Sequence, residues 1–140
     1  MCGIAGLIDR GGRLSPQGLP EIVRAMADVQ RHRGPDAGDI WVDAEARMAF
    51  GHRRLSIIDL SPGAQPMASP DCCFDVTATA EIYTYPELRS ELRALGRSFV
   101  TSSDTEVILA AYEQWGVDAP TRMEGMFAFA LYDRRDRTIF

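Results

Sequence analysis

The stretch that most constrains the fold is residues 72–85, CCFDVTATAEIYTY, which is rich in β-branched and aromatic side chains. Such a composition predicts a long central strand. Residues 125–140, GMFAFALYDRRDRTIF, predict a second strand, a turn and the opening of another strand. Shorter strands are predicted nearer the N-terminus, in residues 2–8, 38–43, 46–54 and 55–59.

Helical spacing of apolar side chains appears in three other segments. The first runs from Leu19 to Val29, and the second has Pro86 in its first turn. The third begins at a capping box formed by Ser103 and Glu106. The order of several strands, two helices and then strands again predicts an α+β layered domain.

Composition and net charge exclude several classes of binding partner for this chain. The 140 residues are 46% apolar, enough for one hydrophobic core. Fifteen basic against 20 acidic residues give a net charge of -5 with no basic stretch, which argues against nucleic acid and anionic membranes. No apolar run approaches the roughly 18 residues that span a bilayer, and no secretory signal opens the chain, so we expect a cytoplasmic protein.

The three cysteines fall into two kinds. Cys72 and Cys73 are adjacent, which is too tight for ordinary disulfide geometry, and they are interpreted as small residues on a strand. Cys2 differs because removal of Met1 would make it the N-terminal residue. An N-terminal cysteine combines a thiol of pKa about 8.5 with an α-amine of pKa about 7.7–8.0. The amine can then serve the thiol as general base without a histidine, although position alone leaves an accidental cysteine as the alternative.

Six motifs occur along the chain in a fixed order: MCGIAG, RHRGPD, GHRRLSIIDLSPGAQPM, EIYTYPELRSELRALG, SSDTEVILAAYEQWG and MEGMFAFALYD. Together they resemble the glutaminase domain of class II glutamine amidotransferases, with the asparagine synthetase branch as the nearest match. A weaker alternative is a branch that feeds sugar phosphates or phosphoribosyl pyrophosphate, against which the third motif argues. The resemblance implies an Ntn-hydrolase four-layer αββα sandwich, truncated at its C-terminus. It makes residues 1–140 an incomplete glutamine amidotransferase type 2 domain, with no synthetase domain.

The resemblance also implies a glutamine site. Cys2 would attack the side-chain amide of glutamine and form a γ-glutamyl thioester. Arg54 would hold the α-carboxylate, a task that suits a planar bidentate donor. Asp104 would bind the α-amino group, with Glu81 nearby. Backbone groups of the segment after Arg54 would line the same pocket: Leu55, Ser56, Ile57 and Ile58.

Several of these residues have purely structural alternatives. Arg54 could belong to a solvated arginine pair. Asp104 follows the capping Ser103, where an acid favours the helix dipole in any case. The RHRGPD segment is most simply a turn held by Gly34 and Pro35, whereas the resemblance implies that it shapes the wall near the nucleophile.

The chain differs from the family pattern at the residues that donate hydrogen bonds to the oxyanion in the transition state of amide hydrolysis. The family reads Asn-Gly before Glu-Ile-Tyr, and this chain has Thr79 and Ala80. The Asn side chain and the Gly N–H form the family's oxyanion hole, and loss of one such donor typically costs about 10²–10³ in rate. Two interpretations stay open: a weakened glutaminase, or a catalytically dead structural or amino-acid-binding remnant.

The resemblance finally implies partners outside these residues. Glutamine would be the substrate, and the ammonia would pass to a C-terminal synthetase domain or subunit that makes asparagine. ATP and Mg are expected only in that missing domain, so we expect no cofactor and no metal in this chain, which could not make asparagine alone. A homodimer is a further association compatible with the resemblance, whereas nucleic acid and membrane are not expected partners.

Overall fold

The computed structural model describes residues 2–56 and 64–140. Its strands form two antiparallel sheets. The first sheet has the order β1-β3-β2, and the second has the order β4-β5-β6-β7. The first contains β1 (Gly3–Ile8), β2 (Ala37–Asp43) and β3 (Met48–Arg54), and the second contains β4 (Met67–Ala68), β5 (Phe74–Ile82), β6 (Gly125–Asp133) and β7 (Thr138–Ile139).

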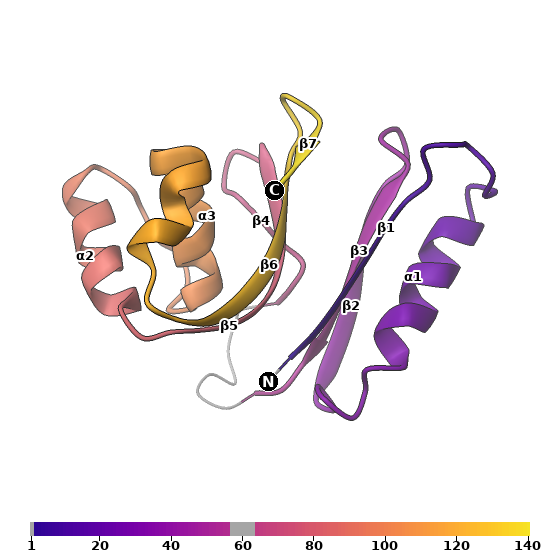
Figure 1. Ribbon diagram of the computed structural model, residues 1–140, viewed down its shortest axis with the longest axis horizontal. Helices are drawn as coiled ribbons and strands as arrows, with labels where there is room; N and C mark the ends of the chain where they lie inside the picture. Colours follow the sequence, from indigo (N-terminus) through magenta and orange to yellow (C-terminus); the bar gives the residue numbers. More distant parts are fainter. Residues whose placement is uncertain (1, 57–63) are drawn as a thin grey trace.

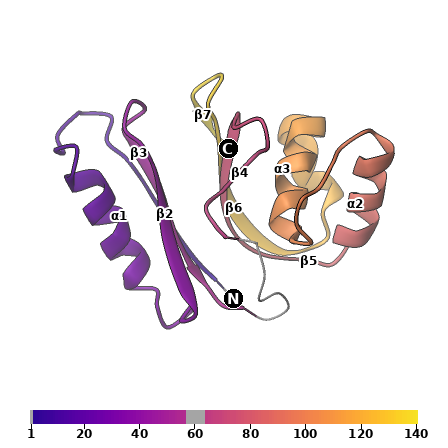
Figure 2. The same ribbon diagram turned by 180° about the vertical axis from the view of Figure 1, so that it is seen from behind.

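Helices cover the two outer faces of the paired sheets (Figures 1 and 2). Helix α1 (Gly18–Asp28) lies on the first sheet, and α2 (Tyr85–Ala94) and α3 (Asp104–Trp115) lie on the second. A 3-10 helix, η1 (Gly116–Arg122), leads from α3 to β6. The arrangement is helix, sheet, sheet, helix, so the predicted αββα sandwich is confirmed.

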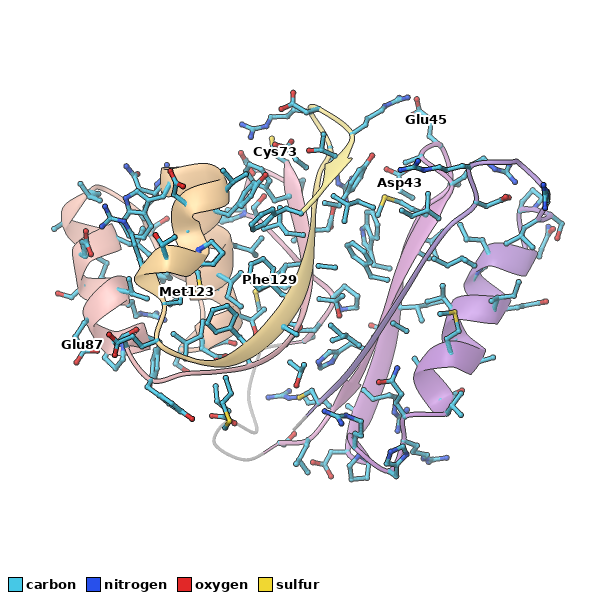
Figure 3. The ribbon with its side chains drawn as sticks, viewed as in Figure 1. Asp43, Glu45, Cys73, Glu87, Met123 and Phe129 are labelled. Carbon is cyan, nitrogen blue, oxygen red and sulfur yellow. The ribbon has the colours of Figure 1, made fainter. Side chains whose placement is uncertain are left out.

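Each interface between layers has its own apolar cluster. Leu19, Val23 and Ala49 pack between α1 and the first sheet. The space between the two sheets is filled around Phe50 and Tyr132. The largest cluster joins the second sheet to α2 and α3, and side chains of β6 such as that of Phe129 (Figure 3) pack against it. Its fully buried members include Val76, Ala78, Leu92, Val107, Ile108 and Leu131.

The predicted elements differ from the observed ones mainly at their ends. The long strand predicted over 72–85 begins at Phe74, because Cys72 has a φ of 57° in the preceding turn, and ends at Ile82 before α2. Of the strand predicted over 55–59, the first two residues are irregular and the others lie outside the described residues.

The capping box predicted for α3 is half right. The Ser103 hydroxyl accepts a hydrogen bond from Thr105 N at 3.1 Å, as a cap should. Glu106 does not return to Ser103. Its carboxylate accepts from the backbone N–H groups of Val100 and Thr101 at 2.7 Å each and so holds the loop before the helix.

Candidate active site

A pocket of about 560 Å³ opens at the end of the sandwich where β1 begins and β3 ends. Figure 1 marks this end of the molecule by the N-terminus. Residues of both sheets, of the loops beside them and of the first turns of α2 and α3 line the pocket: Cys2, His52, Arg54, Leu55, Ser56, Gln65, Ala78, Ala80, Glu81, Ile82, Tyr83, Tyr85, Ser102, Ser103, Asp104 and Thr105.

Cys2 is held by contacts on both its backbone and its side chain. It precedes β1, whose Gly3 pairs with Arg53 of β3. Its Sγ lies 3.9 Å from the carbonyl oxygen of Leu55, and its own carbonyl accepts a hydrogen bond from Arg33 Nε at 3.1 Å. Cys2 is half-buried at the pocket wall. Cys2 therefore lies directly beside the segment that follows β3.

That segment is shaped by the RHRGPD turn. Asp36 N donates to Arg54 O at 3.0 Å, and Asp36 Oδ2 accepts from Ser56 N at 2.7 Å. Gly34 lies so close to β3 that a Cβ atom there would be 2.3 Å from the Arg53 carbonyl carbon, so a side chain is excluded. The turn thus fixes the backbone on either side of Leu55, next to the Cys2 thiol.

The negative charges of the pocket come from two carboxylates, Glu81 on β5 and Asp104 at the start of α3. Asp104 Oδ2 accepts from Ile82 N at 3.4 Å. Burial raises the pKa of the Asp104 carboxyl, the Ile82 hydrogen bond opposes that rise, and the charge of Glu81 adds to it. Arg54 lines the same pocket. A guanidinium and two carboxylates in one pocket complement the two charges of a free α-amino acid.

In β5, the backbone N–H and C=O groups of every second residue point toward this pocket. The N–H and C=O of one residue in an antiparallel strand point to the same side, and the side alternates along the strand. Tyr83 N donates to Glu124 O at 2.7 Å, so odd-numbered residues face β6. Ala78 N and Ile82 N bind Gln65 Oε1 and Asp104 Oδ2 on the other side. The N–H of Ala80, between them, therefore faces the pocket that Ala80 lines.

Thr79 occupies a different position from its neighbour. Its backbone groups face β6, where it pairs with Ala128. The side chain of Thr77, two residues earlier, reaches Gly51 O in the first sheet, and Thr79 projects to the same face. Thr79 is not among the residues that line the pocket in the described part of the chain.

The structure thus brings most of the predicted site residues together. Cys2, Arg54, Leu55, Ser56, Ala80, Glu81 and Asp104 line one pocket. Ile57 and Ile58 lie outside the described residues. Two further pocket residues, His52 and Gln65, received no role from the sequence, although both lie within the motif GHRRLSIIDLSPGAQPM. The alternation of β3, in which His52 and Arg54 share a face, is the signal that could have found His52.

His52 is 1% exposed and reaches β5 across the space between the sheets. Its Nε2 lies 3.1 Å from Ala78 O. A carbonyl only accepts, so Nε2 carries the hydrogen. Burial lowers the pKa of the imidazole to about 4, against the Ala78 hydrogen bond, with the charges of Arg54 and Arg53 as smaller contributions in the same direction as burial. His52 is therefore neutral at pH 7.

Other parts of the described chain offer weaker sites. A second pocket of about 520 Å³ between β4 and α3 has Arg97 and Glu113 on its wall, but they pair with each other at 2.6 Å. Cys73 lies at the end of the sandwich away from the N-terminus (Figures 1 and 3). Among the described side chains, no cluster of three or more His, Cys, Asp or Glu could hold a metal ion. No described helix is both long and apolar enough to cross a bilayer.

The family of this chain follows from its sequence similarity to known proteins. The family model described as "Glutamine amidotransferase domain" matches residues 1–140. This chain belongs to the glutamine amidotransferase domain family. The amidotransferase domain is 38% identical over 140 residues to asparagine synthetase [glutamine-hydrolyzing] 1 of Bacillus subtilis, covering 100% of the chain and 22% of that protein. It is 38% identical over 133 residues to asparagine synthetase B [glutamine-hydrolyzing] of Escherichia coli, covering 95% of the chain and 23% of that protein.

A solved structure of another amidotransferase has a similar fold. The glutamine phosphoribosylpyrophosphate amidotransferase of B. subtilis superposes with a TM-score of 0.69 at 18% identity, covering 94% of this chain and 34% of that one. The likeness supports the four-layer sandwich. The chain spans about a fifth of the length of the asparagine synthetases it matches.

Proposed function

We propose that this amidotransferase domain hydrolyses glutamine to glutamate and ammonia, with Cys2 as nucleophile. The observation that carries the proposal is that the Cys2 thiol shares one pocket with Arg54 and Asp104. A thiol alone would indicate only a reactive cysteine. A thiol beside groups for both charges of an α-amino acid indicates a specific substrate class.

The reaction divides into two steps. After removal of Met1, the Cys2 sulfur adds to the γ-carboxamide carbon, the thiol proton passes through the α-amine to the amide nitrogen, and ammonia leaves. The γ-glutamyl thioester is then attacked by water, which releases glutamate and restores the thiol. Negative charge develops on the carbonyl oxygen of the amide in the first step and of the thioester in the second, and the N–H of Ala80 would donate to it.

Substrate selection follows from the two charged sides of the pocket. A guanidinium binds the α-carboxylate in bidentate fashion, and Asp104 with Glu81 binds the α-ammonium group. A glutamine within a peptide lacks both charges and would leave these groups desolvated without partners. The site is therefore expected to select free glutamine over peptide-bound glutamine.

The ammonia would serve a synthetase partner. Relatives at 38% identity are glutamine-hydrolysing asparagine synthetases, which supports asparagine synthesis as the reaction supplied. We place the ATP and Mg that such a synthesis needs in the partner domain and not in these residues. A cytoplasmic location accords with a free amino acid as substrate.

The second candidate function is amino-acid binding without hydrolysis. The observation that favours it is Thr79, which stands where the family has an oxyanion-hole Asn and is absent from the described pocket lining. Loss of that donor typically costs about 10²–10³ in rate, so slow hydrolysis and simple binding differ in the turnover that remains.

Glutamate release from glutamine by the Met1-processed chain distinguishes the two candidates. We expect slow, saturable release that disappears in Cys2→Ala, while Cys72→Ala, at the other end of the sandwich, keeps the parental rate. Both proteins should bind glutamine in calorimetry. Binding without any release in the parent would establish the second candidate, and absence of binding would contradict both.

A further inference from the structure

Two side chains hold the backbone of Ala78 where a neighbouring strand would usually do so. Gln65 Oε1 accepts from Ala78 N at 2.6 Å, and His52 Nε2–H donates to Ala78 O at 3.1 Å. β4 pairs with β5 only at Met67 and Ala68, so its strand pairing does not extend to Ala78. The side-chain amide of Gln65 thus takes the place of a strand partner for Ala78 at the pocket.

Gln65 also connects this edge to α3. Its Nε2 donates to Thr105 Oγ1 at 2.9 Å, and Thr105 is 2% exposed. The preceding residue, Asp104, accepts from Ile82 N. One side chain therefore joins β5 to the helical turn that carries the carboxylate of the proposed substrate site.

The two residues on either side of the proposed oxyanion donor, Ala80 N–H, are held by side chains. Along this side of β5 the N–H groups of Ala78, Ala80 and Ile82 follow one another at the strand's two-residue repeat. Ala78 is held by Gln65, and Ile82 by Asp104. The direction of the middle N–H is set by the two residues on either side of it.

We propose that Gln65 is a positioning residue for amide hydrolysis, which holds Ala78 so that the N–H of Ala80 points at the oxygen of the attacked amide. This inference rests on the proposed function. Gln65 acts through the backbone and not on the reacting atoms. Among the described residues, Gln65 has no hydrogen bond to Cys2, and Asp104 keeps its own hydrogen bond to Ile82 N when Gln65 is replaced, so the transition state should suffer more than substrate binding.

The test compares two disruptive variants with one matched control. Gln65→Met keeps the length of the side chain and removes both amide contacts, whereas Thr105→Val removes only the anchor of Gln65 on α3. Gln114→Met removes an amide that binds Arg97 on a different part of α3. We expect kcat for glutamate release to fall about ten- to a hundred-fold in Gln65→Met, less in Thr105→Val and not in Gln114→Met. KM for glutamine should stay within about two-fold in all three.

Amide hydrogen exchange in the free chain supplies a readout that needs no activity. Ala78 N–H should exchange about ten-fold faster in Gln65→Met, because its acceptor is gone, while Thr77 N–H, which faces β6, keeps its protection. The Ala80 cross-peak in a ¹H–¹⁵N spectrum should shift in the same variant.

The outcomes separate this inference from the proposed function. An active parent whose kcat is unchanged by Gln65→Met would overturn the positioning role and leave the proposed function standing. An inactive parent would overturn the proposed function, and the positioning of Ala80 would then be decided by exchange. Unchanged protection of Ala78 together with an unshifted Ala80 peak would overturn it, and the expected changes would support it.

Discussion

At the end of β5 that begins with Phe74, Asp75 is paired with an arginine, whereas at the end that finishes with Ile82, Asp104 faces a pocket. Asp75 is 1% exposed and binds Arg134 through two hydrogen bonds, of 2.6 and 3.1 Å. Asp104 accepts a longer bond of 3.4 Å from a backbone N–H, and burial raises its pKa.

The difference shows how one strand serves both structure and chemistry. At the paired end (Phe74–Val76) the carboxylate has a partner within the chain, so its buried charge is compensated by Arg134. At the pocket end (Ala78–Ile82) side chains hold the backbone, and the carboxylate is available to a cationic group of a ligand. Variants of the Asp75–Arg134 pair should change stability alone, and variants of Thr79, Ala80 and Asp104 should change rate or affinity.

The largest expected effect is at the paired end. Arg134→Met leaves the Asp75 carboxylate buried without its guanidinium. Because the Arg134 side chain is 39% exposed and water can partly replace it, the free energy of unfolding should fall by about 3 kcal/mol, the lower end of the range for buried pairs, measured by urea denaturation. Arg137→Met is the matched control, because its pair with Glu45 is exposed and is worth at most about 1 kcal/mol. Equal losses in the two variants would contradict the role of the ion pair at the buried Asp75 carboxylate.

The next effect is a gain of rate at the pocket end. Thr79→Asn combined with Ala80→Gly restores the family's oxyanion residues and should raise kcat for glutamate release by about 10²–10³, equivalent to about 2.7–4 kcal/mol. The same double change in a Cys2→Ala background should give no activity. If the double variant gains nothing over the parent, the amino-acid-binding remnant becomes the better account.

His52 should make the pocket end sensitive to acid. Its pKa is lowered from 6.5 to about 4 in the folded chain, so the unfolded chain takes up a proton at a higher pH. The free energy of unfolding therefore has its full value above pH 6.5. Protonation of His52 in the unfolded chain lowers it by about 3 kcal/mol as the pH falls from 6.5 to 4. His52→Gln should flatten this slope, whereas His32→Gln, at an exposed site, should retain it. Parallel slopes for both variants would exclude His52 as the cause.

The smallest effect separates affinity from stability. Asp104→Asn removes the charge proposed to bind the α-ammonium, and KM for glutamine should rise about ten- to a hundred-fold. Because burial raises the pKa of Asp104, the ionised carboxylate costs the folded state free energy at pH 7, so thermal stability should stay equal or increase. Asp118→Asn, at an exposed position of the 3-10 helix, is the control. A stability loss with unchanged KM would assign Asp104 to the fold.

Much of the fold could be predicted from the pattern of residues. The strand ending at Ile82 and the helix capped by Ser103 follow from β-branched runs and from capping chemistry. The pairing of the two sheets came from the family resemblance, because strand patterns do not say which sheet a strand joins.

The site was less accessible to sequence reasoning. Cys2, Arg54 and Asp104 were predicted through motifs. Gln65 was not, because its role depends on β4 pairing with β5 at Met67 and Ala68 only, a tertiary fact that leaves Ala78 to a side chain. The neutral state of His52 likewise depends on burial between two sheets, which the arginine-rich segment around it does not indicate.

The most direct test of the central claim, that Cys2 and the amino-acid pocket form one site, is covalent labelling with an electrophilic glutamine analogue followed by intact-mass and peptide mapping. We expect one adduct per Met1-processed chain, on Cys2, which excess glutamine prevents and which Arg54→Met greatly slows. No adduct on Cys2, or labelling of Cys72 and Cys73 that glutamine does not prevent, would contradict it.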